Sequence, residues 1–507
     1  MKKTLLHVLY VLAVAQNNFA QQPAFITDSL DAYVQREIKR WQIPGAAIAI
    51  VKDNDVVVAK GYGVTDLETN QPVDGNTLFM IASNTKIFTG TSLALLHHQK
   101  RLSLDDKVVS YLPYFKMYND TLTQMVTIED LLSHRMGFET FQGDFYNWYN
   151  NATRQEIIKN IAKNKPAYQF RDTWGYCNAG FVAAGEILQT VTDTSWEDFI
   201  QHRFFTPLGM YRSSTTNAKI SADKNACKPY TIFQNKLVKL NYDNIDNIGP
   251  CASINSCAND LTNWMHLQLN KGKFNGVQIF PAEVIDETRQ PRSIEGRSAS
   301  PLFPSKHYDL YGLGIGMNDY NGKEMLWHTG GADGFVTTVC FVPEINLGVA
   351  VLTNTDANYF FLAALYQIIE AYLNMPYRNM SAIFYTFYER NTNNTNEQLQ
   401  KWFEQAATYK PLTKQTAEQF TGKYYNGVYG DMHIQFENGK LNMYFEHHPQ
   451  LTGQLQMLTD SSFLCRYDPV NWGVKELPFT LKNGEMNSIS VTVNDFIDFG
   501  VYEFIKR

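Results

Sequence analysis

The sequence has no run of lysine or arginine residues, and its formal net charge is −6. Nucleic-acid partners need concentrated positive charge, so the composition gives no electrostatic support for that class of function. No spacing of its histidines is typical of a metal site, and we expect neither a metal nor another cofactor. The chain instead has 507 residues, of which 44% are hydrophobic and 14% aromatic, which is typical of a folded protein of two domains.

Long apolar runs are also scarce, and the first of them lies at the N-terminus. There Lys2 and Lys3 precede an apolar stretch from Leu5 to Ala15, and the small residue Ala20 follows. The stretch is shorter than the roughly 20 residues of a membrane span, and it fits the apolar core of a secretory signal. We therefore predict a signal peptide over residues 1–20 and a periplasmic or secreted protein without an integral membrane span.

Cysteines are few, and none of the six lies near that segment, which argues against a lipid-anchored N-terminus. An exported protein can form disulfides, and Cys251 and Cys257 are the nearest pair in the sequence. Free buried thiols explain the same residues equally well. The sequence leaves the pairing open.

The order of the expected elements indicates an α+β domain. Residues 43–63 and 334–354 each show two apolar runs around polar turn residues, as antiparallel hairpins do. Helical patterns fill the chain between them, so one sheet would hold strands from both ends of the domain. We assign residues 21–385 to an antiparallel sheet flanked by helices, with a helical subdomain.

The C-terminal part of the chain has a different composition. The polar stretch NTNNTN has linker character, and we predict a linker over residues 386–412. In residues 413–507 short strands alternate with Asn-Gly turns, which indicates a small all-β barrel or sandwich. We expect His447 and His448 to be exposed strand residues.

A serine and a lysine lie one helical turn apart in the stretch TLFMIASNTKIFTGTSLALL, residues 77–96. If Ser83 opens this apolar helix, Lys86 shares its face and can reach its hydroxyl. A serine needs an adjacent base, and a lysine serves only if its pKa falls toward roughly 7–8. The spacing alone is weak, because Ser221 and Lys224 repeat it in a polar run with no apolar helix behind.

Two further segments give the pair its meaning. In DTWGYCNAGF, Tyr176 can pass a proton to a leaving group, and Asn178 can hold a substrate amide and the lysine. In EMLWHTGGADGF, His328 and Thr329 precede Gly330, where the lack of a side chain lets a substrate backbone approach. Motif sets of this kind, in this order, occur in penicillin-recognising enzymes.

With these three segments, and with IPGAAIAIV and CASINSCANDLTNWMHLQLNKGKF around them, residues 25 to 380 resemble the serine β-lactamase-like hydrolases. Within these the chain is similar to the class C branch, which includes CubicO-type peptidases, D-aminopeptidases and esterases. The tail from about Phe420 resembles the lipocalin-like barrel appended to some members. The resemblance implies catalytic Ser83, Lys86 and Tyr176, substrate-binding Asn178, His328, Thr329 and Gly330, and an oxyanion hole made by the N–H groups of Ser83 and Gly331.

The implied function is an exported serine hydrolase that forms an acyl-enzyme on Ser83. Two departures bear on its substrate. Cys177 stands where most relatives have serine, and His328 stands where β-lactamases and D-Ala-D-Ala carboxypeptidases usually have lysine. A histidine of ordinary pKa is only about a quarter protonated at pH 7 and is a weaker partner for a substrate carboxylate. We therefore favour amide, peptide or ester substrates, small molecules or cell-wall peptides, over penicillins.

Other functions remain open on the same residues. The first alternative is a true β-lactamase or D-Ala-D-Ala carboxypeptidase. The second is a penicillin-binding sensor or an inactive binding protein, which belongs to another class. A cysteine nucleophile formed by Cys177 with His328 is the weakest alternative, because Cys177 lies between two motif positions and should face away from the cleft. The sequence does not determine the oligomeric state.

Overall fold

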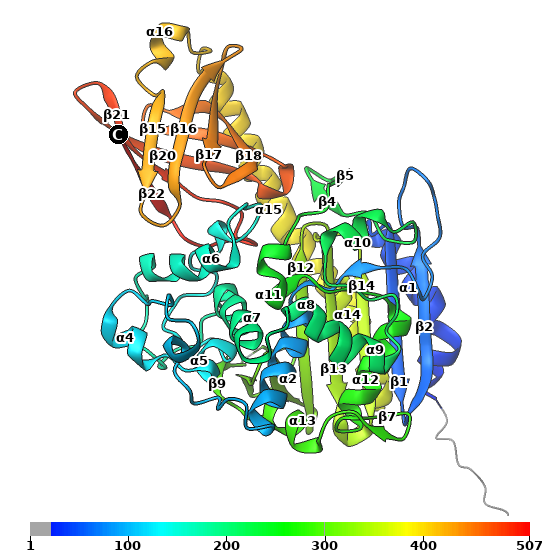
Figure 1. Cartoon of the computed structure of the whole chain (residues 1–507). Coiled ribbons are helices and arrows are strands. Elements are labelled where there is room, and N and C mark those ends of the chain that lie inside the picture. The colour runs from blue at the N-terminus through cyan, green and yellow to red at the C-terminus, as the bar shows by residue number, and fades with distance from the viewer. Residues whose placement is uncertain (1–21, 299) are drawn as a thin grey trace, which may run out of the picture.

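A computed structural model describes residues 22–298 and 300–507, so the predicted signal peptide over residues 1–20 lies outside the described residues. The chain forms an α+β domain and a separate β-barrel above it (Figure 1). This confirms the fold class expected from the sequence. Within the described part, every helix is too short or too polar to cross a membrane.

The α+β domain is built on an eight-stranded antiparallel sheet of order β2-β1-β14-β13-β12-β11-β10-β9. The N-terminal hairpin β1–β2 joins the C-terminal hairpin β13–β14 through β1 and β14, where Ala46 faces Thr353. The two ends of the domain therefore close one sheet, as predicted. The strands are β1 Gly45–Lys52, β2 Asp55–Gly63, β9 Ser293–Arg297, β10 Tyr308–Tyr311, β11 Gly316–Tyr320, β12 Lys323–Ala332, β13 Phe335–Val342 and β14 Leu347–Thr353.

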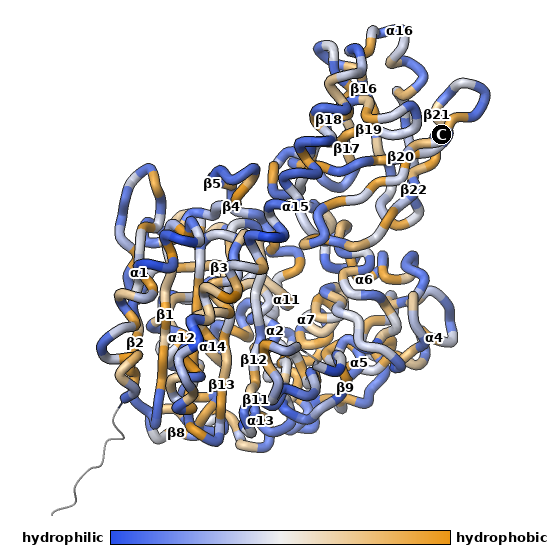
Figure 2. Tube along the Cα trace, turned by 180° about the vertical axis from the view of Figure 1, so that it is seen from behind, coloured by the Kyte–Doolittle hydropathy of each residue, from blue (hydrophilic) through white to orange (hydrophobic). Residues whose placement is uncertain are grey.

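Both faces of the central strands are buried. Successive residues of a strand point to opposite faces, and in β1 Ile48 packs with α1 (Leu30–Arg40) and α14 (Phe360–Tyr372), whereas Ala49 belongs to the core on the other face. That second core contains α2 (Thr85–His98) and α12 (Ala258–Leu269). Figure 2 shows the hydrophobic residues running along β1 and β13.

A helical subdomain fills the chain between β2 and β9. Thr127 caps one of its helices, and the predicted capping interaction with Asp130 is present in both directions. Besides α2 and α12, the helices of this part of the chain are α3 Val108–Tyr111, α4 Asp120–Met125, α5 Ile128–Leu132, α6 Arg154–Asn160, α7 Asn178–Thr192, α8 Trp196–Ile200, α9 Thr206–Leu208, α10 Asn217–Ala222, α11 Gly249–Ala252 and α13 Ala282–Thr288. Short two-stranded ladders join β3 Phe79–Met80 to β6 Asn255–Ser256, β4 Tyr230–Phe233 to β5 Lys236–Lys239, and β7 Lys273–Phe274 to β8 Val277–Gln278.

The segment predicted as a linker is helical over most of its length. Helix α15 runs from Met380 to Thr408 and includes the NTNNTN stretch. Its first turn packs on the α+β domain, where Ser381 accepts a hydrogen bond from Trp41 Nε1 at 2.8 Å. Its last turns pack on the barrel, where the Ala406 carbonyl accepts from Gln456. Contacts at both ends stabilise a helix that asparagine and threonine do not favour.

The C-terminal domain is a closed antiparallel barrel. Its first and last strands pair through Tyr424 and Lys506, and the Asn-Gly pairs at Asn438 and Asn483 form turns, as expected. Side chains fill its interior. After the short helix α16 (Lys414–Ala417) the strands are β15 Gly422–Asn426, β16 Gly430–Glu437, β17 Lys440–Phe445, β18 His448–Thr459, β19 Ser462–Asp468, β20 Val474–Lys482, β21 Glu485–Val491 and β22 Tyr502–Lys506.

The expectation that His448 is exposed is wrong. Its side chain is buried, because the ring stacks on Phe145 of the α+β domain at 4.6 Å and its Nδ1 bonds the Trp148 carbonyl. His447 is half-buried. The open question of the cysteines also has an answer in this structure, since all six are free and buried.

One glycine allows the helix of the sequence motif to pack closely. A Cβ atom on Gly90 of α2 would lie 1.9 Å from the carbonyl oxygen of Leu313. We expect Gly90→Ala to lower the free energy of unfolding by about 1–3 kcal/mol, since the helix or the facing loop must move. Urea unfolding measures the change.

Gly427→Ala is the matched control, because a Cβ atom there meets nothing within 4 Å. Equal stability of the two variants would contradict the close approach of α2 to Leu313.

Candidate active site

The first predicted pair lies at the entrance of α2. Ser83 is in a single helical turn, Ala82–Asn84, that leads directly into the helix. Ala82 has a φ of +46°, which is uncommon for a residue with a side chain. Such backbone conformations concentrate at functional sites. The turn leaves Ser83 half-buried while Lys86 is fully buried.

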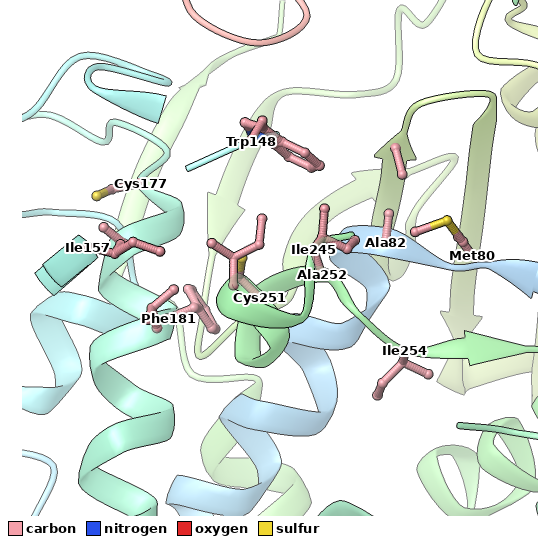
Figure 3. Packing of buried hydrophobic residues seen from close by; sticks show 14 of the residues in the cluster. Met80, Ala82, Trp148, Ile157, Cys177, Phe181, Ile245, Cys251, Ala252 and Ile254 are labelled. Carbon is pink, nitrogen blue, oxygen red and sulfur yellow. The ribbon is translucent and has the colours of Figure 1, made fainter. Parts of the chain in front are cut away.

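Three oxygen atoms surround the amine of Lys86. Its Nζ lies 3.0 Å from Ser83 Oγ, 2.7 Å from Asn178 Oδ1 and 3.0 Å from the Cys251 carbonyl oxygen. Helix α11 brings that carbonyl into place, and Figure 3 shows Cys251 between α7, which carries Phe181, and α2. A neutral amine has two N–H donors and one lone pair. If the amide and the carbonyl accept the two donors, the lone pair is left for the Ser83 proton.

Burial lowers the pKa of Lys86 from its ordinary 10.5 to about 8, and nearby Cys251 and Asp144 act in the opposite direction. Desolvation is the dominant cause because the charged form loses more hydration than the neutral one. A base with a pKa near 8 is largely available at mildly alkaline pH. A lysine can act as a base for the serine only if its pKa is lowered to roughly 7–8, and Lys86 meets this condition.

Tyr176 and Asn178 stand at the start of α7, beside the same amine. Lys86 Nζ lies 4.6 Å from the centroid of the Tyr176 ring, which favours the charged amine that forms after proton transfer. Burial raises the pKa of Tyr176 well above its ordinary value, although the Ser83 hydroxyl, as a hydrogen-bond partner, acts against this. Tyr176 is thus a neutral phenol that can donate a proton.

His328 lies on β12 and is neutral. Burial, followed by the charge of Lys86, lowers its pKa to about 3. Its Nδ1 faces the Thr329 carbonyl and must carry the proton, so its Nε2 accepts from the Tyr311 hydroxyl at 2.8 Å. The protonated fraction is far below the quarter expected for an ordinary histidine.

The glycines after His328 bring β12 against the turn of Ser83. A Cβ atom on Gly330 would lie 2.0 Å from the Ile81 carbonyl oxygen, so no other residue fits without movement. In the described part, β11 pairs with β12 only as far as Trp327. The following edge of β12, which includes Gly331, has no partner strand on that side and borders the cavity.

The cavity has a volume of about 270 Å³ and contains all the predicted site residues except Lys86, which lies behind Ser83. Aromatic side chains make up about half of its lining, which includes one carboxyl, that of Glu295, but no lysine or arginine among the described residues. The lining residues are Ser83, Thr140, Phe141, Trp148, Trp174, Tyr176, Asn178, Glu295, Tyr311, Gly316, Trp327, His328, Thr329, Gly330, Gly331, Val336, Phe361 and Phe496.

Several residues of the site were missed from the sequence. The Cys251 carbonyl has no side-chain signature. Asp144, which binds Asn178, lies in the segment FQGDFYNWYN, which matches no motif. Phe496 belongs to the barrel domain, yet a Cβ atom on Gly331 would lie 2.5 Å from its ring. Only the aromatic richness of both segments could have drawn attention to them.

Two alternative readings of the motifs find no support in the geometry. Cys177 lies outside the main cavity, Figure 3 shows it on the side of α7 away from Cys251, and burial raises its pKa to about 12. It therefore has neither the position nor the thiolate of a nucleophile. The Ser221 hydroxyl donates a hydrogen bond to Asn217 Oδ1 on a short, largely exposed helix, and not to an amine.

A known protein family matches most of this chain. The family model for beta-lactamases matches residues 30–373, more than half of the chain. The chain belongs to the beta-lactamase family. Members of this family are generally serine hydrolases with the β-lactamase fold. A second family model, for a domain of unknown function named DUF3471, matches residues 407–504, which cover the barrel except for the end of β22.

Relatives and solved structures extend the comparison. The chain is 27% identical to protein flp of Staphylococcus aureus (strain COL) over 336 residues, which is 65% of this chain and 63% of that protein. It is 26% identical to the unguisins hydrolase of Aspergillus violaceofuscus over 381 residues, 68% of this chain and 65% of that one. The match thus spans less than two thirds of these relatives.

Two solved structures share the fold. The octameric penicillin-binding protein homologue from Pyrococcus abyssi aligns with a TM-score of 0.61 and 20% identity, over 94% of this chain and 99% of that one. The D-stereospecific amidohydrolase from Streptomyces sp. aligns with a TM-score of 0.54 and 20% identity, over 67% of this chain and 97% of that one.

The pKa of Lys86 predicts the pH dependence of this beta-lactamase family member. The neutral amine is the form that accepts a proton, so kcat/KM for an uncharged ester should rise with pH, and the last step of that rise should follow the Lys86 pKa of about 8. His328 adds no step between pH 5 and 9, because its pKa lies at about 3. Initial rates corrected with a Ser83→Ala blank test this, and a flat profile from pH 6 to 9 would contradict it.

Proposed function

We propose that the protein is an exported serine hydrolase that cleaves amide, peptide or ester bonds through an acyl-enzyme on Ser83. The observation that carries the proposal is the position of Lys86 Nζ, 3.0 Å from Ser83 Oγ with two acceptors on its other sides. Such a contact between nucleophile and base is the diagnostic geometry of an activated serine.

The reaction follows from these positions. Ser83 Oγ attacks the substrate carbonyl carbon while its proton moves to Lys86 Nζ. The N–H groups of Ser83 and Gly331 stabilise the negative charge on the carbonyl oxygen. Tyr176 gives its proton to the leaving amine or alcohol and is reprotonated from Lys86. Water then attacks the acyl-enzyme and releases the acid, with the same groups acting in reverse.

The lining of the cavity supports uncharged substrates. Among the described lining residues no side chain carries a positive charge, since His328 is neutral and Lys86 lies behind Ser83. A buried substrate carboxylate without a cationic partner pays a large desolvation cost. Aromatic walls with few polar groups instead suit apolar acyl groups. Penicillins and peptides with a free C-terminal carboxylate are therefore disfavoured.

The nucleophile is tested by labelling and by substitution. We expect a fluorophosphonate probe to modify Ser83, and Ser83→Ala to abolish both the labelling and the hydrolysis of p-nitrophenyl butyrate. Mass spectrometry of peptides identifies the modified residue.

Ser221→Ala is the matched control, because it removes the serine of the second Ser-x-x-Lys copy on an exposed helix. Turnover that persists in Ser83→Ala, or label that appears elsewhere, would refute the assignment.

The substrate class is tested by comparing substrates of opposite character. We expect kcat/KM for p-nitrophenyl butyrate to exceed that for the carboxylate-bearing β-lactam nitrocefin by at least about 10²-fold, the size of the penalty for an unpaired buried charge. Efficient nitrocefin hydrolysis would favour a β-lactamase. A persistent penicillin adduct without turnover would favour a sensor.

A further inference from the structure

The carboxyl of Asp144 fixes the orientation of the amide that binds the catalytic lysine. Asn178 Nδ2 donates to Asp144 Oδ2 at 2.5 Å, and Asn147 Nδ2 donates to Asp144 Oδ1 at 2.7 Å. The Asn178 amide therefore presents its oxygen, not its nitrogen, to Lys86. Asp144 itself is 1% exposed, so water does not compete for these bonds.

This orientation matters for proton transfer. With the oxygen of Asn178 toward it, Lys86 donates an N–H to the amide and keeps its lone pair for Ser83. If the amide turned over, its N–H would point at the amine and compete with the Ser83 proton for that lone pair. Asp144 thus controls the base without touching it.

The segment that carries Asp144 is held by the C-terminal barrel. Asp498, between β21 and β22, accepts a hydrogen bond from the Phe145 N–H at 3.0 Å, and the Tyr502 hydroxyl accepts one from the Gly143 N–H at 3.1 Å. The Phe145 side chain is completely buried, and its ring lies against Tyr429 and His448 of the barrel. Both neighbours of Asp144 are therefore bound by the other domain.

We propose that Asp144 is a positioning residue for Lys86, acting through Asn178, and that Asp498 of the barrel holds Asp144 in place. The C-terminal domain is then a working part of the active site and not an appended module. The inference rests on the proposed function of Ser83 and Lys86, and it assigns a role to two carboxyls that the motifs leave out.

The charges around Asp144 give a second readout. Burial, followed by the charge of Asp498, raises the pKa of Asp144 to about 7, while Asn178 and Lys86 lower it. Burial also raises the pKa of Asp498, so the repulsion between the two carboxyls weakens as the pH falls. The other titratable groups that face it, Tyr176 on the approach to α7, Cys177 at its N-cap and Cys251 on α11, are neutral because burial raises their pKa values. Below pH 7 the Asp144 carboxylate becomes protonated, and one of its two oxygen acceptors becomes an O–H donor.

The pH profile of kcat should therefore contain two protonation steps on its acid side, which belong to Asp144 and Lys86 as a coupled pair. A plot of log kcat against pH steepens from a slope near 1 toward a slope near 2 as the pH falls. Asp144→Asn removes one of the two groups and should leave a slope of 1.

The experiment compares three variants of the full chain. Asp144→Asn has the same shape but turns one acceptor into a donor, and we expect kcat for p-nitrophenyl butyrate and the fluorophosphonate labelling rate to fall about 10²-fold, with KM little changed. Asp498→Asn leaves Asp144 intact, and we expect a smaller loss, about tenfold, with faster hydrogen exchange at the Phe145 N–H.

Asp460→Asn is the matched control. Asp460 is an exposed carboxylate of the same barrel that also accepts a hydrogen bond from a tyrosine hydroxyl, that of Tyr409. We expect wild-type kcat, wild-type exchange and the two-step profile.

Each variant tests one part of the proposal. Wild-type kcat and a two-step profile in Asp144→Asn would overturn the positioning role. Unchanged kcat and exchange in Asp498→Asn would overturn the role of the barrel, and this variant decides the question if Asp144→Asn does not fold. Failure of the wild-type chain to label at Ser83 would instead refute the proposed function. Even then, hydrogen exchange at the Phe145 N–H would still measure whether Asp498 stabilises the contact between the two domains.

Discussion

The site depends on one buried amine. Taking the Lys86 side chain out of water disfavours its charge, and the charges of nearby Cys251 and Asp144 compensate only in part, so its pKa lies at about 8. Helices α7 and α11 approach so closely that a Cβ atom on Gly185 would lie 2.2 Å from Pro250, and this contact places the Cys251 carbonyl. The nucleophile, the amide and the phenol all meet at the same nitrogen.

The neutral histidine on β12 is consistent with this arrangement. A lysine at that position would add a second positive charge near Lys86 and would lower the pKa of the base by repulsion. Here the shift comes from burial, and His328 is fixed as one tautomer between Tyr311 and a backbone carbonyl. The pKa of Lys86 is thus lowered without a second cation in the cavity. The cost is the loss of a partner for anionic substrates.

The sequence predicted those parts of the structure that have a local signature. Apolar runs around turn residues revealed both hairpins of the sheet. The order of three short motifs indicated a shared site, and Ser83, Tyr176 and His328 do line one cavity, with Lys86 behind Ser83. It could not reveal a backbone carbonyl such as that of Cys251, or Asp144, whose role depends on a tertiary contact. Helix α15 was missed for a related reason. Its asparagines and threonines favour irregular chain, and only packing on both domains makes it helical.

The length of α15 fixes how the two domains meet. A helix of 29 residues is about 44 Å long, and each added or removed residue turns whatever follows by about 100° and shifts it by about 1.5 Å. Inserting one residue would rotate the barrel about the helix axis and break its contacts with the Phe145 ring. Inserting seven residues, about two full turns, would restore the rotation of the barrel but would move it farther along the helix axis. Insertions and deletions should therefore be tolerated in the surface loops of this protein and not in α15, which acts as a spacer of fixed length between the two domains.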